Sequence, residues 1–569
     1  MTRRIVRTLG QVATATVVTL VVLFFLDRNF RVLPNALHEY LPTHHAGLVI
    51  TDITATQCSS INPFTKCDLD PEIWHRIDKD LYLGKTMFSS AYVYVRRKRE
   101  EDLTPQDRVV MDVTVGRIDP SKADTGKPTT NSGKGGVGRH GHQEEEHWES
   151  RPLGIWIRRS NRRTASDDKN AVTAVDVLFG DDAVEAREGW EIRGTPLLLA
   201  GSGSSNPAAQ ITIRRGPPRE PFRPQPRINE NGKFKIVQLA DLHLSTGTGN
   251  CRDALPKDWN GRKCEADPRT LEFVTRVLED EKPDFVVLSG DQVNGDTAPD
   301  VQSAIFKYAQ LLIKHKLPYV TIFGNHDDEG SLPRSAQMAL VESLSYSLSK
   351  AGPEDVDGVG NYYIEVLAGG NSAHSAITIY LLDTHAYSPD EKHYPGYDWL
   401  KPSQIEWFRE TSQGLKKKHK EYTHHHMDVA FIHIPLFEYR LPENPWVGTW
   451  MEAPTAPMFN SGFHDALVEQ GVVMVSAGHD HVNEYCMLSQ EVAEDKPPVP
   501  KLWMCYAGGA GFGGYAGYEG FHRKIRVFDF DMNQARISTW KRTEFGEIDK
   551  RLDEQIIVDG GRPIAPMEE

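Results

Sequence analysis

The chain has 569 residues, of which 39% are hydrophobic and 25% charged, and its formal net charge is −14. This composition is typical of a globular protein and excludes a fibrous or fully disordered chain. One hydrophobic core seldom serves so many residues, so we expect at least two folded units. Proteins that bind nucleic acid are more often basic, so the acidic balance argues against a nucleic-acid partner.

The N-terminus carries a membrane signal. Residues 8–26 contain no charged side chain, and Arg3, Arg4 and Arg7 precede them. Nineteen helical residues rise about 28 Å, close to a hydrocarbon core of roughly 30 Å. Because positive residues tend to stay in the cytoplasm, residues 1–30 are predicted to be a single-pass anchor with a cytoplasmic N-terminus. The rest of the chain would then be lumenal, in the vacuole or secretory pathway. The alternative is a cleaved signal peptide and a secreted protein.

Six cysteines form three close pairs along the chain: Cys58 and Cys67, Cys251 and Cys264, and Cys486 and Cys505. Close spacing in an oxidising compartment favours local disulfides, although spacing does not fix their connectivity. Six reduced, buried thiols are the alternative. The chain has no Asn-x-Ser/Thr glycosylation site, which counts against a lumenal location.

The first part of the chain, residues 45–215, has short apolar runs of strand length and is predicted to be a β-rich domain. Residues 119–150 interrupt it with a polar stretch that lacks apolar periodicity, so a disordered insert is expected there. Residues 216–231 begin with a proline-rich run and are predicted to be a linker between domains.

The second part, residues 232–545, alternates apolar runs of strand length with helical patterns, which predicts an α/β domain. Its later strands come with fewer helices, which favours a pair of mixed sheets over one doubly wound parallel sheet. A glycine-rich run at 508–520 lacks the features of a phosphate-binding P-loop and is predicted to be a flexible loop beside the site. Residues 546–569 are predicted to be a tail.

Five short polar blocks in this second part each follow an apolar strand. They are Asp241-Leu242-His243, Gly290-Asp291, Gly324-Asn325-His326-Asp327, His433 and Gly478-His479-Asp480-His481. Ligands of open α/β sheets bind at the carboxyl ends of strands, so the five blocks can converge on one crevice. Their oxygen and nitrogen donors, without a thiolate, suit Zn, Fe or Mn.

In this order, the five blocks resemble the signature of the calcineurin-like metallophosphoesterase superfamily. Residues 234–245, 324–334, 360–365 and 398–408 also resemble the fungal dosage-dependent cell-cycle regulator phosphatases and the plant purple acid phosphatase 28/29 type. The resemblance implies a four-layer αββα sandwich of two mixed sheets flanked by helices. Asn294 stands where the true purple enzymes have their chromophoric tyrosine, so no purple colour is expected.

The resemblance also implies a site for two divalent or trivalent metal ions. Asp241, His243 and His481 would bind one ion, Asn325, His433 and His479 the other, and Asp291 would bridge both. A hydroxide held between the metals would attack phosphorus. His326 would donate a proton to the leaving group, and Asp327 would orient His326. Asp480 is expected to be structural, because it points away from its neighbouring histidines.

The function implied is that of a binuclear phosphomonoesterase, with a phosphorylated protein (phosphoserine or phosphothreonine) or a small phosphomonoester as substrate. Two alternatives stay open at this stage. The same fold can hydrolyse phosphodiesters, and the chain could instead be an inactive binding module that metals stabilise. The β-rich region could serve as a docking module for a protein substrate.

Overall fold

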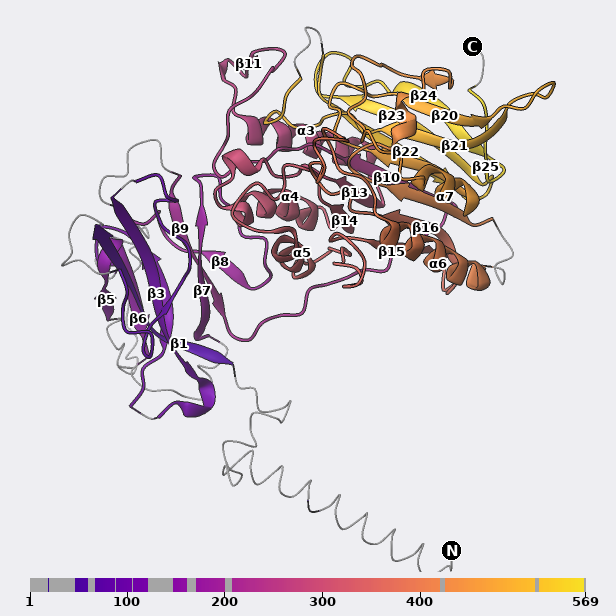
Figure 1. Cartoon of the computed structure of the whole chain (residues 1–569). Helices are drawn as coiled ribbons and strands as arrows, with labels where there is room; N and C mark the ends of the chain where they lie inside the picture. Colours follow the sequence, from indigo (N-terminus) through magenta and orange to yellow (C-terminus); the bar gives the residue numbers. More distant parts are fainter. Residues whose placement is uncertain are drawn as a thin grey trace, which may run out of the picture.

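The structure, a computed structural model, describes residue 19 and residues 47–59, 67–86, 88–104, 106–120, 147–160, 170–199, 207–419, 425–516 and 521–566 (Figure 1). Within these ranges no helix is both long and apolar enough to span a bilayer. The predicted anchor, residues 1–30, lies outside the described residues except for Thr19, as does most of the predicted insert, residues 121–146. The last residues of that insert are ordered, because Trp148–Ser150 form a strand.

The N-terminal β domain, residues 47–215, consists of three small antiparallel sheets. Their strand orders are β1 (Leu48–Ser59), β3 (Ser89–Arg99), β2 (His75–Arg76); β4 (Val110–Val115), β6 (Ile155–Arg159), β5 (Trp148–Ser150); and β7 (Val172–Phe179), β9 (Ala209–Arg215), β8 (Trp190–Ile192). Alternate apolar side chains of these strands point inward and share one buried core, which includes Ile53, Val113, Ile157 and Ile211.

Two seven-stranded mixed sheets form the C-terminal domain. The first has the order β14 (Tyr319–Ile322), β13 (Phe285–Ser289), β10 (Lys233–Leu239), β22 (Lys524–Asp531), β23 (Arg536–Thr543), β24 (Leu552–Asp559), β25 (Arg562–Pro563). The second has the order β15 (Tyr362–Leu367), β16 (Ser375–Leu381), β17 (Met427–Phe431), β19 (Val472–Ala477), β21 (Val499–Tyr506), β20 (Cys486–Glu491), β18 (Trp446–Val447). A short hairpin, β11 (Asp258–Trp259) and β12 (Arg262–Lys263), stands apart. Residues 546–569, predicted as a tail, thus supply β24 and β25 to the first sheet.

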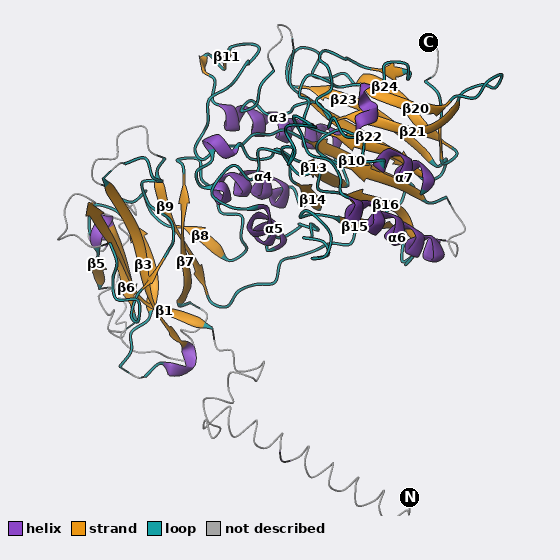
Figure 2. Cartoon of the chain, viewed as in Figure 1, coloured by secondary structure: helices purple, strands orange, loops and turns teal. Residues whose placement is uncertain are grey.

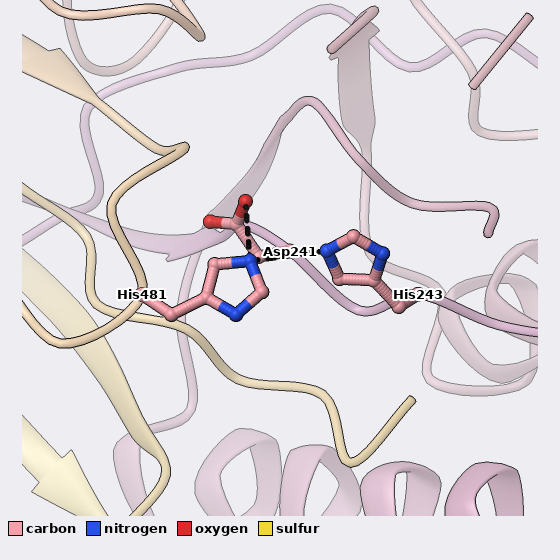
Figure 3. A group of neighbouring side chains, drawn as sticks. All are labelled: Asp241, His243 and His481. Atoms are coloured by element: carbon pink, nitrogen blue, oxygen red, sulfur yellow. Dashed lines mark hydrogen bonds and ion pairs between the residues drawn. The ribbon is translucent and has the colours of Figure 1, made fainter. Parts of the chain in front are cut away.

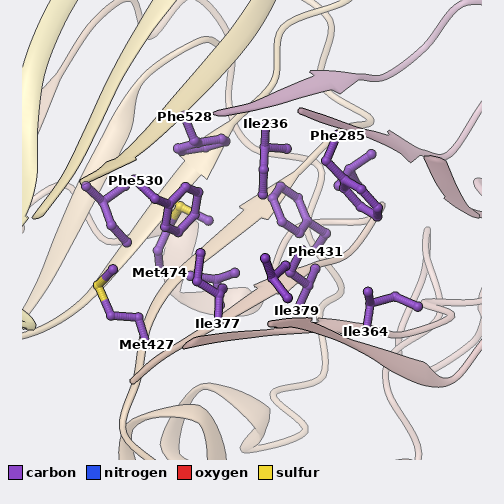
Figure 4. Close-up of a cluster of buried hydrophobic side chains, with 14 of the residues drawn as sticks. Ile236, Phe285, Ile364, Ile377, Ile379, Met427, Phe431, Met474, Phe528 and Phe530 are labelled. Atoms are coloured by element: carbon purple, nitrogen blue, oxygen red, sulfur yellow. The ribbon is translucent and has the colours of Figure 1, made fainter. Parts of the chain in front are cut away.

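The sheets are packed face to face, and helices cover their outer faces (Figure 2). The period of two along β10 shows why: Ile236 points into the core between the sheets, and Val237 points to the helices on the outer face. Phe431 and Phe528 belong to the inner core, with ring centroids 6.0 Å apart (Figure 4). The helices are α3 (Ala266–Glu281), α4 (Val301–Lys314) and α5 (Arg334–Glu342) on the first sheet, and α6 (Pro402–His419) and α7 (Phe463–Glu469) on the second. The α/β fold with two mixed sheets is therefore confirmed.

All six cysteines are paired as their spacing suggested: Cys58 with Cys67, Cys251 with Cys264, and Cys486 with Cys505. The third pair directly joins β20 to β21, where the two residues are opposite each other in the ladder. The alternative of reduced thiols is wrong for this structure.

Candidate metal centre

The polar blocks converge because the strands that carry them are parallel. β10, β13 and β14 run parallel in the first sheet, and β17 and β19 run parallel in the second. Their carboxyl ends therefore meet at one edge of the sandwich. Figure 3 shows Asp241 and His243, which follow β10, beside His481, which follows β19.

The backbone is strained at four of the candidate ligands. Asp241, His243, Asp291 and His479 have φ angles of 57°, 48°, 52° and 77°. These left-handed conformations cost roughly 1–3 kcal/mol each in residues other than glycine, and they cluster at functional sites. They turn the chain sharply at the ends of the strands, so that side chains from both sheets face the same space.

The first group of donors is Asp241, His243 and His481, all buried and mutually close enough to hold one ion. The Nε2 atoms of the two histidines are 3.0 Å apart, and Nε2 of His481 is 3.3 Å from a carboxylate oxygen of Asp241. Nδ1 of His481 donates to the backbone oxygen of Tyr515 at 2.7 Å. In the neutral ring this leaves the lone pair of Nε2 directed into the site, as in a metal-binding histidine.

The second group is Asp291, His433 and His479. Nε2 of His433 lies 3.2 Å from Asp291 and 3.3 Å from the side-chain oxygen of Asn325, while its Nδ1 donates to the backbone oxygen of Ser289 at 2.9 Å. Asp291 also lies 3.9 Å from Nε2 of His243, so its carboxylate stands between the two groups.

The charges of these residues suit cation binding. Burial is the main cause that lowers the pKa of His243 to about 3 and that of His479 to about 4, so both rings are neutral near pH 7. Burial also opposes a charge on His433, but the Asp291 carboxylate outweighs it and raises that pKa to about 9. A cation bound by Nε2 of His433 would therefore displace the proton that this ring shares with Asp291 in the metal-free chain. Nε2 of His479 is buried and has no hydrogen-bond partner among the described residues. An unpaired buried nitrogen is costly unless a ligand satisfies it, so the donor set fits two cations.

The structure corrects one expectation about the acid. Among the described residues, no hydrogen bond joins the carboxylate of Asp327 to the ring of His326. Its carboxylate accepts the backbone N–H groups of Asp291, Gly324 and Val293 at 2.8, 2.6 and 2.9 Å, so it holds the loop of the bridging carboxylate. The partner of His326 is Glu329, 2.7 Å from Nδ1. The sequence did not indicate that His326 pairs with Glu329, because a separation of three residues within a loop predicts no contact.

His326 itself is placed as expected beside the donors. The backbone N–H of His326 donates to the carboxylate of Asp291 at 2.8 Å, its ring centroid is 5.4 Å from that of His243, and its side chain is 36% exposed. Burial lowers the pKa of His326, but the charges of Asp291 and Glu329 outweigh burial and raise it above its ordinary value. Asp480, which was expected to be structural, accepts hydrogen bonds from the backbone N–H of Thr455 and the hydroxyl of Tyr506.

Sequence reasoning missed the glycine-rich run as a structural support. Residues 508–514 are buried behind the first group of donors. A Cβ on Gly514 would be 2.6 Å from the ring of His243 and closer still to that of His481, so only glycine fits there. Beside it, the ring of Tyr515 stacks on His481 with centroids 4.2 Å apart. Tyr397 contacts His479 edge-on at the same distance.

Comparison with known proteins agrees with this geometry. The family model of the calcineurin-like phosphoesterases matches residues 234–483. The chain is 38% identical to Phosphatase DCR2 of Saccharomyces cerevisiae over 69% of its own length and 68% of that protein. It is 30% identical to an uncharacterized protein of Schizosaccharomyces pombe over 88% of both chains.

A plant relative differs in what its name implies about activity. The chain is 34% identical to the probable inactive purple acid phosphatase 14 of Arabidopsis thaliana, over 58% of this chain and 84% of that one. The relatives thus include one protein named as a phosphatase and one named as inactive. On these grounds the chain belongs to the calcineurin-like phosphoesterase family.

Proposed function

We propose that this chain is a binuclear metal-dependent phosphomonoesterase. The observation that carries the proposal is that two buried groups of donors, each able to hold one cation, lie side by side, with Asp291 of the second group 3.2 Å from His433 and 3.9 Å from His243 of the first. Asp241, His243 and His481 would hold the first ion, and Asn325, His433 and His479 the second. His326 is not one of the metal donors, and its side chain is partly exposed next to them. A module that only binds metal would not need such a residue, whereas a phosphatase can use it as a proton donor.

Two bound cations supply positive charge for the phosphate oxygens and a water of lowered pKa, the chemistry expected of Mn, Zn or Fe pairs. The remaining work belongs to the chain. Asp291 accepts the N–H of His326 and so fixes the loop that carries this imidazole. Burial lowers the pKa of His326, but the charges of Asp291 and Glu329 raise it above its ordinary value, which favours the protonated ring that would donate a proton to the leaving oxygen. General acids of this kind typically contribute about 10²–10⁴-fold to the rate.

A phosphoserine or phosphothreonine side chain of a protein is the proposed substrate. The proton donor lies at the protein surface, with His326 36% and the neighbouring Tyr387 49% exposed. Tyr387 donates to Glu329 at 2.9 Å, which places it beside the acid. A phosphorylated residue on another chain can reach this open rim without entering an enclosed pocket.

The test compares p-nitrophenyl phosphate with bis-p-nitrophenyl phosphate and a phosphoserine peptide, with Mn, Zn and Fe supplied in turn. The proposal expects faster turnover of the monoester and of the peptide than of the diester. Faster turnover of the diester would identify a phosphodiesterase. Two bound equivalents of metal without turnover of any of the three substrates would identify an inactive binding module, as the name of the plant relative implies for that protein.

We also propose a lumenal or extracellular location. Three disulfides support it, because disulfides persist in oxidising compartments. Fractionation of cells that express the chain, followed by protease protection of sealed vesicles, tests this location. A catalytic domain that protease digests in intact vesicles would contradict the lumenal alternative.

A further inference from the structure

The loop that follows His243, residues 244–249, is held by one buried lysine. Nζ of Lys307, on α4, donates to the backbone oxygens of Ser245 and Gly247 at 2.9 and 2.7 Å. It also pairs with Asp267 at 2.7 Å, and the same carboxylate accepts the N–H of Ser245 at 2.9 Å. The Lys307 side chain is only 2% exposed, so these contacts replace water almost completely.

The fourth partner of Lys307 comes from the N-terminal β domain. Asp182 lies 2.6 Å from Nζ of Lys307. Two positions before it, the backbone of Gly180 lies directly against the loop, since a Cβ there would be 3.1 Å from Cα of Gly247. The β domain therefore reaches a point only a few residues from the candidate ligand His243.

A second contact of the β domain acts on the same loop. Lys79 pairs with Asp300 at 2.9 Å, and the backbone of Asp300 exchanges two hydrogen bonds of 3.0 Å with the hydroxyl of Thr246. Lys79 also donates to the backbone oxygen of Val177 in β7. Two charged residues of the β domain thus contact the two groups, Lys307 and Asp300, that hold residues 245–247.

Apolar packing makes this junction continuous. Leu178 and Ala186 of the β domain are buried in the same core as the inner faces of α3 and α4. The N–H of Phe179 donates to the hydroxyl of Ser303 on α4 at 2.8 Å, and the guanidinium of Arg187 lies 5.1 Å from the ring of Phe306. In Figure 1 the strand β7 lies beside α4, and β5 is on the far side of the β domain.

We propose that the N-terminal β domain positions the first group of metal donors, with Asp182 and Lys79 as its positioning residues. Neither residue is a donor itself. Asp182 acts through Lys307, and Lys79 acts through Asp300, and both keep the chain that follows His243 in the conformation that lets this histidine face His481. The β domain is then an integral part of the centre and not a detachable docking module. The metal-affinity part of this inference rests on the proposed function.

The test uses the full chain with Asp182→Asn and Lys79→Met. Glu149→Gln is the matched control, because Glu149 pairs with Arg151 at 3.0 Å within the β domain and sits on β5. Hydrogen exchange of the amides of residues 243–249 reports the loop without any metal. Titration with Mn²⁺ alone reports the two sites, and the melting temperature reports general stability.

Loss of one charge-assisted hydrogen bond should speed local hydrogen exchange by about tenfold or more. We expect this faster exchange at the amides of residues 243–249 in Asp182→Asn and in Lys79→Met, and unchanged exchange there in Glu149→Gln. Both should also weaken one of the two Mn²⁺ equivalents by about tenfold. Asp182→Glu should restore much of the lost protection. Unchanged exchange in both variants would overturn the inference. Equal weakening of both Mn²⁺ equivalents, together with a lower melting temperature, would mean that Asp182 and Lys79 only stabilise the fold. That result would also overturn the inference.

The two proposals can fail separately. If the unsubstituted chain binds no Mn²⁺, Zn²⁺ or Fe²⁺, the proposed function fails, while hydrogen exchange still decides the loop inference. If the chain binds two ions and the variants bind them equally well with unchanged exchange, only the loop inference fails.

Discussion

Nδ1 of His326 lies 2.7 Å from a carboxylate oxygen of Glu329, and the other oxygen of Glu329 accepts a hydrogen bond from Tyr387. A carboxylate can only accept, so His326 donates this bond through Nδ1, and its Nε2 has no hydrogen bond to any residue that the structure describes. The proposed acid is thus oriented by the carboxylate three residues after it.

Replacing Glu329 by Gln should slow turnover and move the basic limb of the pH profile. Burial lowers the pKa of His326, and the charges of Asp291 and Glu329 raise it above the ordinary value. Activity that needs protonated His326 falls as the pH rises through that pKa, so removing one negative charge shifts the fall to lower pH. Loss of a charge-assisted hydrogen bond predicts a decrease in kcat of about 10-fold to 100-fold.

The control for this change is Asp328→Asn, because Asp328 pairs with Arg334 at 3.1 Å in the same loop. Its basic limb should match that of the unsubstituted protein. If the basic limb of the pH profile of Glu329→Gln coincides with that of the unsubstituted protein, Glu329 does not tune the pKa of His326.

Asp327→Asn should act on metal binding and not on the acid. Its carboxylate accepts three backbone N–H groups, among them that of Asp291. The asparagine side chain has only one acceptor oxygen, so it cannot replace all three of these hydrogen bonds. We expect metal affinity to fall by about 10-fold to 100-fold, the range measured for groups that support ligands. The basic limb of the pH profile, measured at saturating metal, should not move. A basic limb that shifts in Asp327→Asn would instead support the predicted role of Asp327 in orienting His326.

Gly324→Ala should abolish activity while the protein stays folded. A Cβ at this position would overlap Asp291 and lie 2.6 Å from Nε2 of His433. Gly414→Ala is the matched change, since Gly414 is in α6 and has nothing within 4 Å of an added Cβ. The control should retain full activity and gain about 0.5–1 kcal/mol in stability, because alanine is the better helix former. Circular dichroism and turnover are measured on both, and an active Gly324→Ala protein would disprove the close approach at the site.

Removal of metal by a chelator should lower the melting temperature. Cations that bind only the folded chain, at a thousand times their Kd, stabilise it by about 4 kcal/mol. For a domain of this size the loss corresponds to a shift of about 5–10 °C. Scanning calorimetry with and without chelator measures it, and restoring Mn or Zn should reverse it. A melting temperature that is the same under both conditions would contradict a metal centre in the folded core.

The convergence of the candidate donors could be predicted, because each block that carries them follows an apolar strand. His433 and His479 could be assigned to one crevice, since strand ends of a parallel sheet share an edge. The sequence could not predict the partner of His326, because Asp327 and Glu329 are both nearby carboxylates and only the turn of the loop selects between them.

Two other differences arise from contacts between residues distant in sequence. β24 was missed because Leu552–Asp559 has weak alternation, and its strand character comes from pairing with β23. The glycine-rich run looks flexible in isolation. In the structure it packs against His243 and His481, which leave no room for a side chain at Gly514. The ion pairs of Asp182 with Lys307 and of Lys79 with Asp300 also join separate domains, and no local pattern reveals such pairs.

The most direct test of the central claim is metal-dependent hydrolysis of p-nitrophenyl phosphate by the full chain and by Asp291→Asn, with bound metal counted in each. Asp291 belongs to the second group of donors and also faces the first, so its loss should reduce turnover by about 10²-fold to 10³-fold, the range for removal of one electrostatic stabiliser of a transition state. It should also weaken retention of at least one metal ion. The account predicts turnover that appears with Mn, Zn or Fe in the unsubstituted chain and is lost in the variant. Turnover that needs no metal, or that Asp291→Asn retains in full, would contradict it.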